Sequence, residues 1–345
     1  MTHALLFDWG DTVMRLFGFP GPMAYWPRVE AVPGVAEALQ ALQPRYRLVV
    51  ATNAAESGAA LVREALERAG LGIYFEAVFT AQELGACKPE PAFFQAVLEE
   101  LGCAPSEAVM VGDAYRADVV GAKEAGLRAV WFNPEGAPCP LTHPVHDAEV
   151  RAMAALPGAL GRMNLPDMAK CFALLAEQEV SPWIVRHVLA VAAVAFYLAG
   201  RLAGLGEEVD PLLAHRGGLL HDLDKVSAQR QGRVHGQLGA EILREKGYPQ
   251  LAPVVERHLA LNLLDPARRP ATWEEKLVYY ADRIVEDDRV VGVEERLEAL
   301  CQRYADRAEA MRRCHPLVLA LEEEIAGRLG VTPAAMLSEL QERLP

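Results

Sequence analysis

The sequence predicts two domains of different class, a doubly wound α/β domain with a parallel sheet and then an all-α helical bundle. In the first half, short apolar runs of strand length alternate with helical patterns, an order typical of a parallel sheet covered by helices on both faces. From Asp167 onward, apolar residues recur with a helical period and no strand pattern is convincing. The chain of 345 residues is long enough for two cores, and we place the domains at residues 1–162 and 163–345.

Composition and charge narrow the class of protein. A hydrophobic content of 52% with mixed charge indicates a folded globular protein. The net charge of -13 disfavours non-specific binding to nucleic acids or to anionic membranes, so we expect neither as a partner. Small anionic substrates remain compatible with this charge, because bound metal ions can reverse the local field.

The cysteines and the apolar stretches indicate the cellular compartment in which the protein is expected. The six cysteines form no CxxC pair, which favours reduced thiols in the cytoplasm. The start of the chain has one short apolar run that ends at Asp8, so we expect no signal peptide. The longest apolar stretch, residues 188–200, is too short to span a bilayer and predicts a core helix.

The first half contains five strand-like runs, at residues 4–7, 48–51, 77–80, 108–112 and 129–132. Between them lie helical patterns at residues 35–42, 59–69, 91–101 and 118–125. Polar residues follow three of these runs at their carboxyl ends, where ligands bind in open parallel sheets: Asp8, Thr52, Asn53 and Asp113.

Four signals occur in one order in this half: Asp8-Trp9-Gly10-Asp11-Thr12, Thr52-Asn53, Lys88-Pro89, and Gly112-Asp113 with Asp118. With them, residues 4–162 resemble the haloacid dehalogenase (HAD) superfamily, most of whose members are phosphatases. The resemblance implies that Asp8 is the nucleophile that becomes an aspartyl phosphate. It also implies substrate binding by Thr52, Asn53 and Lys88, and an Mg²⁺ ion held by Asp8, Asp113 and Asp118. These roles suit the chemistry, because cations must offset the repulsion between a carboxylate and a phosphate.

One departure from the HAD pattern affects catalysis. The usual motif is Asp-x-Asp-Gly-Thr, whose second Asp protonates the leaving group, but here Gly10 and Asp11 have changed places. Asp11 either reaches the leaving oxygen by another backbone path or only caps a loop. Loss of general acid-base help, typically about 10²–10⁴ in rate, would leave a slow phosphatase or a phosphate-binding protein. The gap between Asp8 and Thr52 is too short for a large cap, so the site is open, or covered by the second domain or by another subunit of a homo-oligomer.

The second half is organised around an adjacent His221-Asp222 pair that follows an apolar run. His187, His258 and Asp282 each fall on the apolar face of a predicted helix, and His235 lies between them in the sequence. A buried carboxylate is costly unless it is paired or bound to metal. Imidazoles and carboxylates collected in a helical bundle therefore predict a metal site.

Residues 183–305 resemble the HD superfamily of metal-dependent phosphohydrolases. Residues 220–225 are similar to its HDIGK form, with Asp224 where glycine is usual, and residues 279–283 are similar to its closing segment. The resemblance implies one metal ion held by His187, His221, Asp222 and Asp282. His235 and His258 match the added ligands of the two-metal branch, which includes bacterial hydrolases of diadenosine tetraphosphate, and Asp222 would bridge the ions. Such mixed ligands suit Fe or Mn. Lys225 is either a catalytic phosphate contact or a solvated helix residue.

The sequence therefore predicts a phosphohydrolase whose HD half cleaves a nucleotide or a dinucleoside polyphosphate. The HAD-like half would remove or bind a phosphate of a related small molecule. The alternative is a regulatory protein in which an impaired HAD-like domain senses a phosphorylated ligand and modulates the HD domain. The remaining histidines match neither pattern, and we interpret them as surface or structural residues: His3, His143, His146, His215 and His315.

Overall fold

The computed structural model describes residues 2–54 and 56–344. The chain forms two compact units, Met1–Pro140 with Val145–Asn164, and Leu141–Pro144 with Leu165–Pro345. Residues 141–144, which the sequence assigned to the first domain, thus belong with the second unit. The chain enters the second unit again between Asn164 and Leu165, close to the predicted boundary between residues 162 and 163.

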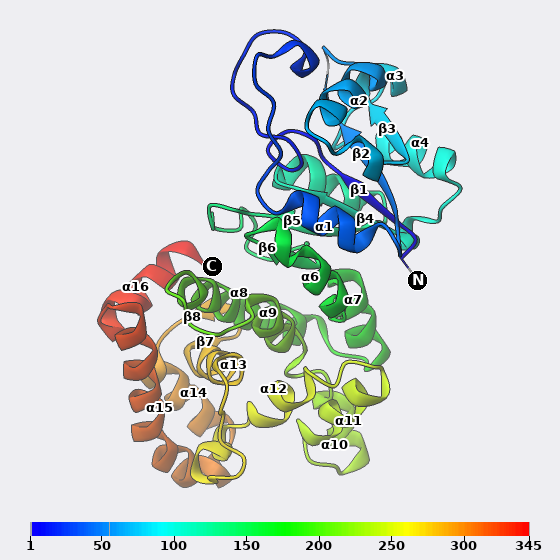
Figure 1. The fold of residues 1–345 in the computed structure, drawn as a ribbon. Coiled ribbons are helices and arrows are strands. Elements are labelled where there is room, and N and C mark those ends of the chain that lie inside the picture. Colours follow the sequence, from blue (N-terminus) through cyan, green and yellow to red (C-terminus); the bar gives the residue numbers. More distant parts are fainter. Residues whose placement is uncertain (1, 55, 345) are drawn as a thin grey trace. The chain divides into compact units, whose positions relative to one another are not determined.

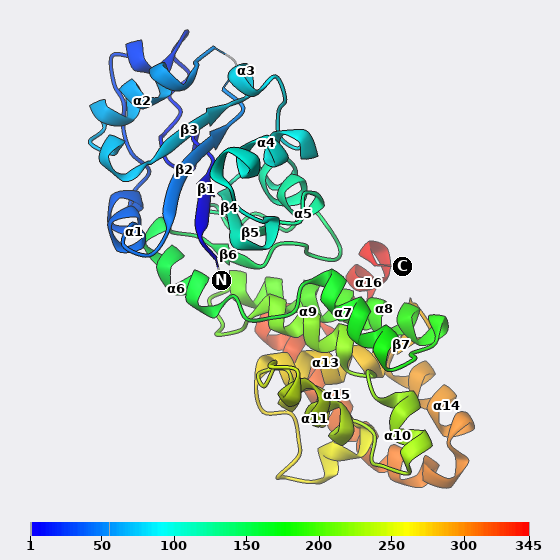
Figure 2. The same ribbon diagram turned by 90° about the vertical axis from the view of Figure 1, so that its right-hand side faces the viewer.

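The first unit is built on a six-stranded parallel sheet in the order β3-β2-β1-β4-β5-β6 (Figures 1 and 2). The strands are β1 (Ala4–Phe7), β2 (Arg47–Thr52), β3 (Ala77–Thr80), β4 (Ala108–Gly112), β5 (Arg128–Phe132) and β6 (Ala148–Val150). The predicted doubly wound sheet is confirmed. The strand order reverses between β1 and β4, and β1 pairs with β4 from Ala4↔Ala108 to Phe7↔Val111. Asp8 and Asp113 therefore leave the sheet side by side, at the switch point where α/β proteins bind ligands.

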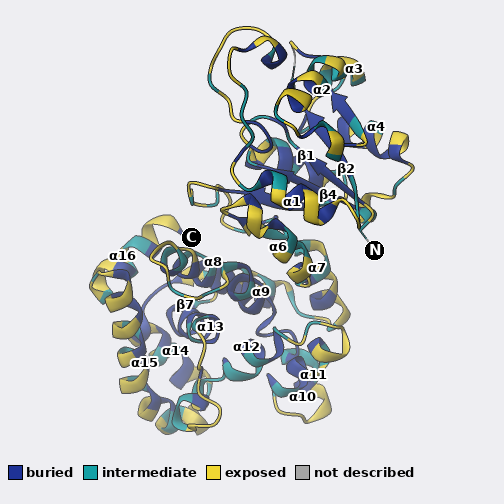
Figure 3. Ribbon diagram, in the orientation of Figure 1, coloured by how far each residue is buried: buried dark blue, intermediate teal, exposed yellow. Residues whose placement is uncertain are grey.

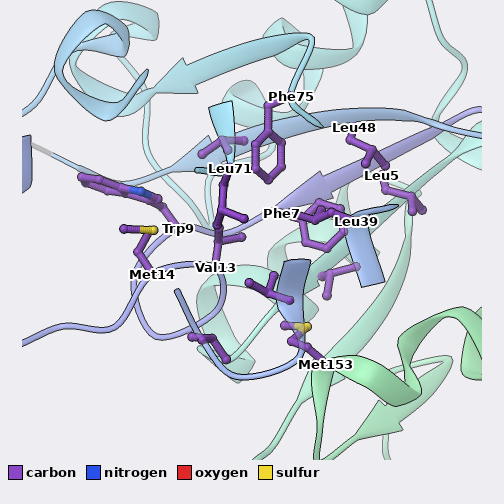
Figure 4. Packing of buried hydrophobic residues seen from close by; sticks show 14 of the residues in the cluster. Leu5, Phe7, Trp9, Val13, Met14, Leu39, Leu48, Leu71, Phe75 and Met153 are labelled. Atoms are coloured by element: carbon purple, nitrogen blue, oxygen red, sulfur yellow. The ribbon is translucent and has the colours of Figure 1, made fainter. Parts of the chain in front are cut away.

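Helices cover both faces of this sheet because alternate residues of each strand point to opposite sides. Leu5 and Phe7 pack in one apolar cluster with Leu39, as Figure 4 shows, whereas Leu6 packs in another cluster with Phe93. The helices are α1 (Val35–Leu42), α2 (Ala59–Arg68), α3 (Ala81–Leu84), α4 (Pro91–Leu101), α5 (Gly121–Glu124) and α6 (Leu156–Arg162). Short 3₁₀ turns lie at Met23–Tyr25, Gly72–Tyr74, Pro105–Glu107 and Met153–Ala155.

The predicted helix at residues 118–125 begins earlier than expected. A π-helical segment, Tyr115–Val120, precedes the short α5. The start is fixed by a tertiary contact, because the Tyr115 ring packs edge-on against Trp131 with ring centroids 4.9 Å apart. The Asp118 N–H donates to the carbonyl of Ala114, and Asp118 is thereby carried to the carboxyl end of β4.

The second unit is an assembly of helices, as predicted: α7 (Met168–Glu177), α8 (Pro182–Gly204), α9 (Pro211–Leu220), α10 (Lys225–Gln231), α11 (Gln237–Glu245), α12 (Ala252–Arg257), α13 (Trp273–Ile284), α14 (Val293–Arg303), α15 (Ala308–Leu329) and α16 (Pro333–Arg343). Turns of 3₁₀ helix lie at Ala260–Leu264 and Ala305–Arg307. The expectation of helices alone was wrong at one place. Strands β7 (Val285–Glu286) and β8 (Arg289–Val290) form a short antiparallel hairpin, too short to give an alternating pattern.

Close packing of α8, α9 and α13 forms the core of the second unit, and burial is continuous along their inner faces (Figure 3). A Cβ atom on Gly218 would lie 2.8 Å from Cα of Ala192, so the backbones of α9 and α8 approach each other too closely for any larger residue. A Cβ on Gly217 would lie 2.5 Å from Cγ1 of Val254. The two glycines therefore seat the end of α9 deep in the bundle, and His221 follows directly.

Helix α8 is long and apolar enough to cross a membrane when judged by length and composition alone. Of its most apolar window, 61% is buried inside the helical unit. This burial is what the sequence predicted for residues 188–200, although the helix extends beyond that stretch at both ends.

The segment 141–144 is fixed to the second unit by the buried side chain of Arg216. Its Nη2 donates to the carbonyl of Pro144 at 3.1 Å, and its Nε donates to the carbonyl of Pro166 at 3.0 Å. His215 contacts Nη1 of Arg216 at 2.7 Å through Nδ1 and His143 at 3.0 Å through Nε2. His143 and His215 thus have structural contacts outside the candidate metal-ligand set of the helical unit.

Candidate active sites

Three carboxylates meet at the carboxyl end of the parallel sheet. One oxygen from each of Asp8, Asp113 and Asp118 lies within 4.8 Å of the others. Asp8 follows β1, Asp113 follows β4, and Asp118 comes from the π-helical segment. The Thr12 hydroxyl donates to Oδ1 of Asp113 at 2.9 Å and fixes that carboxylate. Oxygen ligands of this kind fit Mg²⁺.

Lys88 lies between two of these carboxylates. Its Nζ donates to Oδ1 of Asp8 and to Oδ1 of Asp118, both at 2.6 Å, and its side chain is only 1% exposed. Burial lowers the pKa of Lys88, but the charges of Asp8 and Asp118 outweigh burial and raise it. The lysine is therefore a fixed cation beside the Asp8 carboxylate.

Asn53 holds the backbone of Lys88 rather than pointing to a free space. Its Nδ2 donates to the Lys88 carbonyl at 2.8 Å, and its Oδ1 accepts from the Lys88 N–H at 2.7 Å. Thr52 is buried at the end of β2, where its hydroxyl accepts from the N–H of Ala54 at 3.2 Å. Asn53 thus positions Lys88, while Thr52 lies at the same edge of the sheet as Asp8.

Gly112 leaves the space that Asp118 occupies. A Cβ atom at residue 112 would lie 2.2 Å from Oδ2 of Asp118, and the same oxygen accepts from the N–H of Ala114 at 3.0 Å. Burial raises the pKa of Asp118 to about 7, against the lowering effect of Lys88. Burial likewise raises the pKa of Asp113. Bound cations would favour the charged forms of both groups.

In the helical unit, three histidines and two aspartates form two overlapping groups. One is His187, His221 and Asp282, and the other is His221, Asp222 and His258; in each, one ligand atom per residue lies within 4.8 Å of the others. Among the described residues, Nε2 of His221 is buried without a hydrogen-bond partner. It lies 3.8 Å from Oδ1 of Asp222 and 3.9 Å from Oδ1 of Asp282. A buried, unpaired ring nitrogen between two carboxylates fits a metal ligand.

The three histidines of these groups share one arrangement, in which Nδ1 donates to a backbone carbonyl and Nε2 faces the carboxylates. Nδ1 of His221 donates to Gly218 at 2.7 Å, that of His187 donates to Asp287 at 2.8 Å, and that of His258 donates to Val255. Such outer bonds fix the tautomer that leaves Nε2 free for a metal ion. Burial lowers the pKa of His221, and it lowers the pKa of His258 to about 3, so both rings are neutral at pH 7.

The carboxylates stay charged although they are buried. Burial alone raises the pKa of Asp222 and of Asp282, but neighbouring cations lower both well below the usual range. For Asp282 these neighbours include Arg283, which donates to Oδ2, and Arg296, whose Nη2 lies 3.3 Å from Oδ1. The contact of Arg296 with Asp282 was not predicted from the sequence. Its register with Val293 and Leu300 on α14 could have indicated a buried arginine.

Comparison with known proteins agrees with both halves of this geometry. A family model for haloacid dehalogenase-like hydrolases matches residues 21–126, and a model for the HD domain matches residues 184–311. The chain thus contains a haloacid dehalogenase-like hydrolase domain and an HD domain. The first match includes Lys88, Asp113 and Asp118, with Asp8 preceding it, and the second includes all the ligand candidates of the helical unit. These domain matches support a hydrolase that acts on phosphate esters.

Relatives of the HAD-like domain are varied. An uncharacterized protein, MJ0778, of Methanocaldococcus jannaschii is 34% identical over 153 residues, which cover 41% of this chain and 87% of the relative. Phosphoserine phosphatase of Thermus thermophilus is 48% identical over 73 residues, 21% of this chain and 29% of that protein. Ribulose-1,5-bisphosphate 5-phosphatase of Halopiger xanaduensis is 38% identical over 111 residues, 32% of this chain and 46% of that protein. The chain thus spans less than half of the length of each named phosphatase.

Two predicted residues of the HAD-like and HD domains had alternative interpretations, and the geometry favours one for each. Asp11 has a left-handed backbone (φ 51°), and its Oδ1 accepts from the N–H of Leu16 at 2.9 Å, which favours the loop-capping interpretation. Nζ of Lys225 donates to Oδ2 of Asp222 and lies 5.8 Å from the centre of the Trp183 ring. Lys225 therefore lies at the HD site rather than on a solvated helix face.

The sequence predicted that His258 lies inside a helix, but the residue follows the end of one. Helix α12 ends at Arg257, directly before His258, and the Ala260–Leu264 turn follows. The reason is local, because Nδ1 of His258 takes the Val255 carbonyl that would otherwise accept from the N–H of Leu259 in a continuing helix. The helix end places the ring in the HD site.

Asp224, which replaces the usual glycine of the HD motif, orients His235. Its buried carboxylate accepts from Nδ1 of His235 at 2.7 Å through Oδ1 and from the N–H groups of Gly236 and Gly239, both at 2.8 Å, through Oδ2. Nε2 of His235 is thereby turned toward Oδ1 of Asp222, 2.8 Å away. From the sequence, Asp224 was only a departure from the usual glycine, because no pattern shows that residues 236 and 239 return to its carboxylate.

We expect Asp224→Asn to weaken one metal-binding position of the HD domain and spare the other. Loss of an outer carboxylate partner typically lowers metal affinity about 10–100-fold. Titration with Mn²⁺ followed by calorimetry should show one weakened binding event and one unchanged event. Gly239→Ala provides a second variant, since its Cβ would press on the Asp224 carboxylate from 3.1 Å. Two binding events of wild-type affinity in both variants would contradict a positioning role for Asp224.

Proposed function

We propose that the HD domain hydrolyses a phosphoester or phosphoanhydride bond of a nucleotide or a dinucleoside polyphosphate at a centre of two transition-metal ions, Fe or Mn. The observation that carries this proposal is the unpaired Nε2 of His221, which belongs to both ligand groups. A ring nitrogen binds one ion, so we assign His187, His221 and Asp282 to the first ion. His235 and His258 would hold the second ion, and Asp222 would bridge the two.

Bound ions at this centre would supply an activated water molecule and would neutralise phosphate oxygens. The protein's own residues fix the rest of the site. Lys225, with 30% of its side chain exposed, offers a positive charge beside Asp222 to a phosphate that lies over the centre. Arg283 and Arg296 hold Asp282 in place from the other side.

For the HAD-like domain, we propose that Asp8 attacks the phosphorus atom of a small phosphorylated molecule and becomes an aspartyl phosphate. Asp8, Asp113 and Asp118 would hold Mg²⁺, which offsets the negative charge of the phosphate. The fixed cation of Lys88, 2.6 Å from Asp8, lowers the repulsion between the carboxylate and the incoming phosphate. Thr52 at the adjoining strand end would donate to a phosphoryl oxygen.

A second function is favoured by one observation. The carboxylate of Asp11 is bound to the N–H of Leu16, and residue 10 is glycine, so neither position provides an oriented general acid. A domain that binds a phosphorylated ligand and turns it over slowly could regulate the HD domain as a sensor.

The test is phosphate release by the wild type, Asp8→Asn and Asp282→Asn proteins. Nucleotides, dinucleoside polyphosphates, sugar phosphates and aryl phosphates are each supplied with Mg²⁺, Mn²⁺ or Fe²⁺. We expect Asp282→Asn to abolish hydrolysis of nucleotide-type substrates alone and Asp8→Asn to abolish hydrolysis of the other esters alone. If wild-type rates never exceed those of the double variant, the hydrolase proposal is wrong. If Asp8→Asn changes only the kinetics of the HD domain, the sensor function holds.

A further inference from the structure

The space beside residue 10 of the HAD-like domain is filled by an apolar side chain. A Cβ atom on Gly10 would lie 3.1 Å from Cδ1 and 3.3 Å from Cγ of Leu16. Leu16 is 53% exposed, and its side chain borders the space that a side chain at residue 10 would take. A proton donor at residue 10 is absent by sequence, and the geometry leaves little room for one.

Asp11, the nearest carboxylate in the sequence, is held in a different direction. Its N–H donates to the carbonyl of Met14 at 2.7 Å, and its Oδ1 accepts from the N–H of Leu16 at 2.9 Å. The turn that carries it is anchored, because the N–H groups of Val13 and Met14 both donate to the carbonyl of Trp9 and all three side chains are buried. Turning the Asp11 side chain toward Asp8 would break its hydrogen bond with the N–H of Leu16.

The other ionisable groups placed around Asp8 in the described chain are engaged. Asp113 accepts from Thr12, and Asp118 accepts from Lys88 and from the N–H of Ala114. Lys88 is shared between Asp8 and Asp118. Asp113 and Asp118 are also proposed magnesium ligands, so neither is available to protonate a leaving oxygen.

We propose, resting on the proposed function of Asp8, that this site uses phosphate donors whose leaving group departs without a proton: acyl phosphates or aryl phosphates. In the first step, an oxygen of Asp8 forms a bond to phosphorus, and the bond from phosphorus to the leaving oxygen breaks. The electron pair of that bond remains on the leaving group, which departs as an anion. In the second step, water attacks the aspartyl phosphate, a proton passes to solvent, and inorganic phosphate and the Asp8 carboxylate are released.

The consequence is a strong discrimination against alkyl phosphates. An alkoxide is a poor leaving group unless an acid protonates it, and general acid help is worth about 10²–10⁴ in rate. An aryl oxide or a carboxylate leaves as a stable anion and needs no such help. The site should therefore favour aryl and acyl phosphates over alkyl phosphates by at least about 100-fold.

The experiment measures kcat/KM with Mg²⁺ for acetyl phosphate, a series of aryl phosphates of increasing phenol acidity, and glycerol phosphate. The full chain carries Asp282→Asn to remove HD activity, and Asp8→Asn is the blank. We expect kcat/KM to rise steeply with phenol acidity, and Asp11→Asn to leave that slope unchanged. A flat series, or a slope that steepens in Asp11→Asn, would overturn the inference alone. No Asp8-dependent turnover even of acetyl phosphate would overturn the proposed function with it.

A gain-of-function variant tests the same inference from the other side. The double variant Gly10→Asp with Leu16→Ala introduces a carboxylate and removes the side chain that occupies its space. We expect hydrolysis of glycerol phosphate to increase about 100-fold and the dependence on phenol acidity to become shallower. Leu16→Ala alone is the matched control and should keep the steep dependence. An equal increase in the single and double variants would contradict the assigned role of residue 10.

Discussion

Asp222→Ala is expected to strip the HD domain of its transition metal and to abolish its hydrolytic activity. Oδ1 of Asp222 lies 2.8 Å from Nε2 of His235, 3.7 Å from Nε2 of His258 and 3.8 Å from Nε2 of His221. One oxygen thus faces ligands assigned to both ions. Metal ions supply several kcal/mol of transition-state stabilisation, so their loss corresponds to a fall of roughly 10³-fold or more in rate.

Elemental analysis of protein purified without added metal checks this prediction. We expect about two transition-metal ions per chain in the wild type and close to none in Asp222→Ala. Asp306→Ala is a suitable control, because the Asp306 side chain is 77% exposed and lies outside both ligand groups. Circular dichroism of each variant shows whether the helices persist. Full metal content in Asp222→Ala, or a wild type that takes up no metal on reconstitution, would rule out the proposed centre.

The parallel sheet could be predicted from sequence because its central strands are buried on both faces. All four residues of β1 are fully buried, so the strand appears as an unbroken apolar run bounded by the polar Asp8. What could not be predicted depends on contacts between distant residues. The early start of the helix at Tyr115 depends on Trp131, and the assignment of residues 141–144 to the helical unit depends on Arg216.

For the candidate sites, too, sequence patterns predicted part of the structure, and contacts between distant residues decided the rest. The candidate metal ligands could be identified from the sequence, because a His or Asp on the apolar face of a helix is unusual. The directions of the side chains could not be predicted. The direction of Asp11 depends on its left-handed backbone at φ 51°. The role of Asp224 depends on the chain folding back so that the N–H of Gly236 reaches its carboxylate. Asn53 was predicted to bind substrate, whereas its amide is occupied by both backbone groups of Lys88.

Lys88→Met is expected to remove most Asp8-dependent turnover and to destabilise the HAD-like domain. The substitution keeps an unbranched side chain, one heavy atom shorter, but leaves Asp8 and Asp118 without their shared cation. Loss of one preorganised charge at a reacting group typically costs about 10²–10³ in rate. Removal of one partner from a buried ion pair typically costs about 3–5 kcal/mol in the free energy of unfolding.

Magnesium dependence distinguishes this electrostatic role from simple packing. Without Lys88, a divalent ion becomes the main charge that balances the carboxylates, so Mg²⁺ should raise the melting temperature of Lys88→Met more than that of the wild type. Lys123→Met is the matched control, because Lys123 pairs with Asp147 at 3.1 Å in the same domain, outside the carboxylate group. It should lose stability without losing turnover or gaining magnesium dependence. If both variants respond alike to Mg²⁺, the charge of Lys88 is not part of the Asp8 site, and the attack of Asp8 on phosphate would need another source of neutralisation.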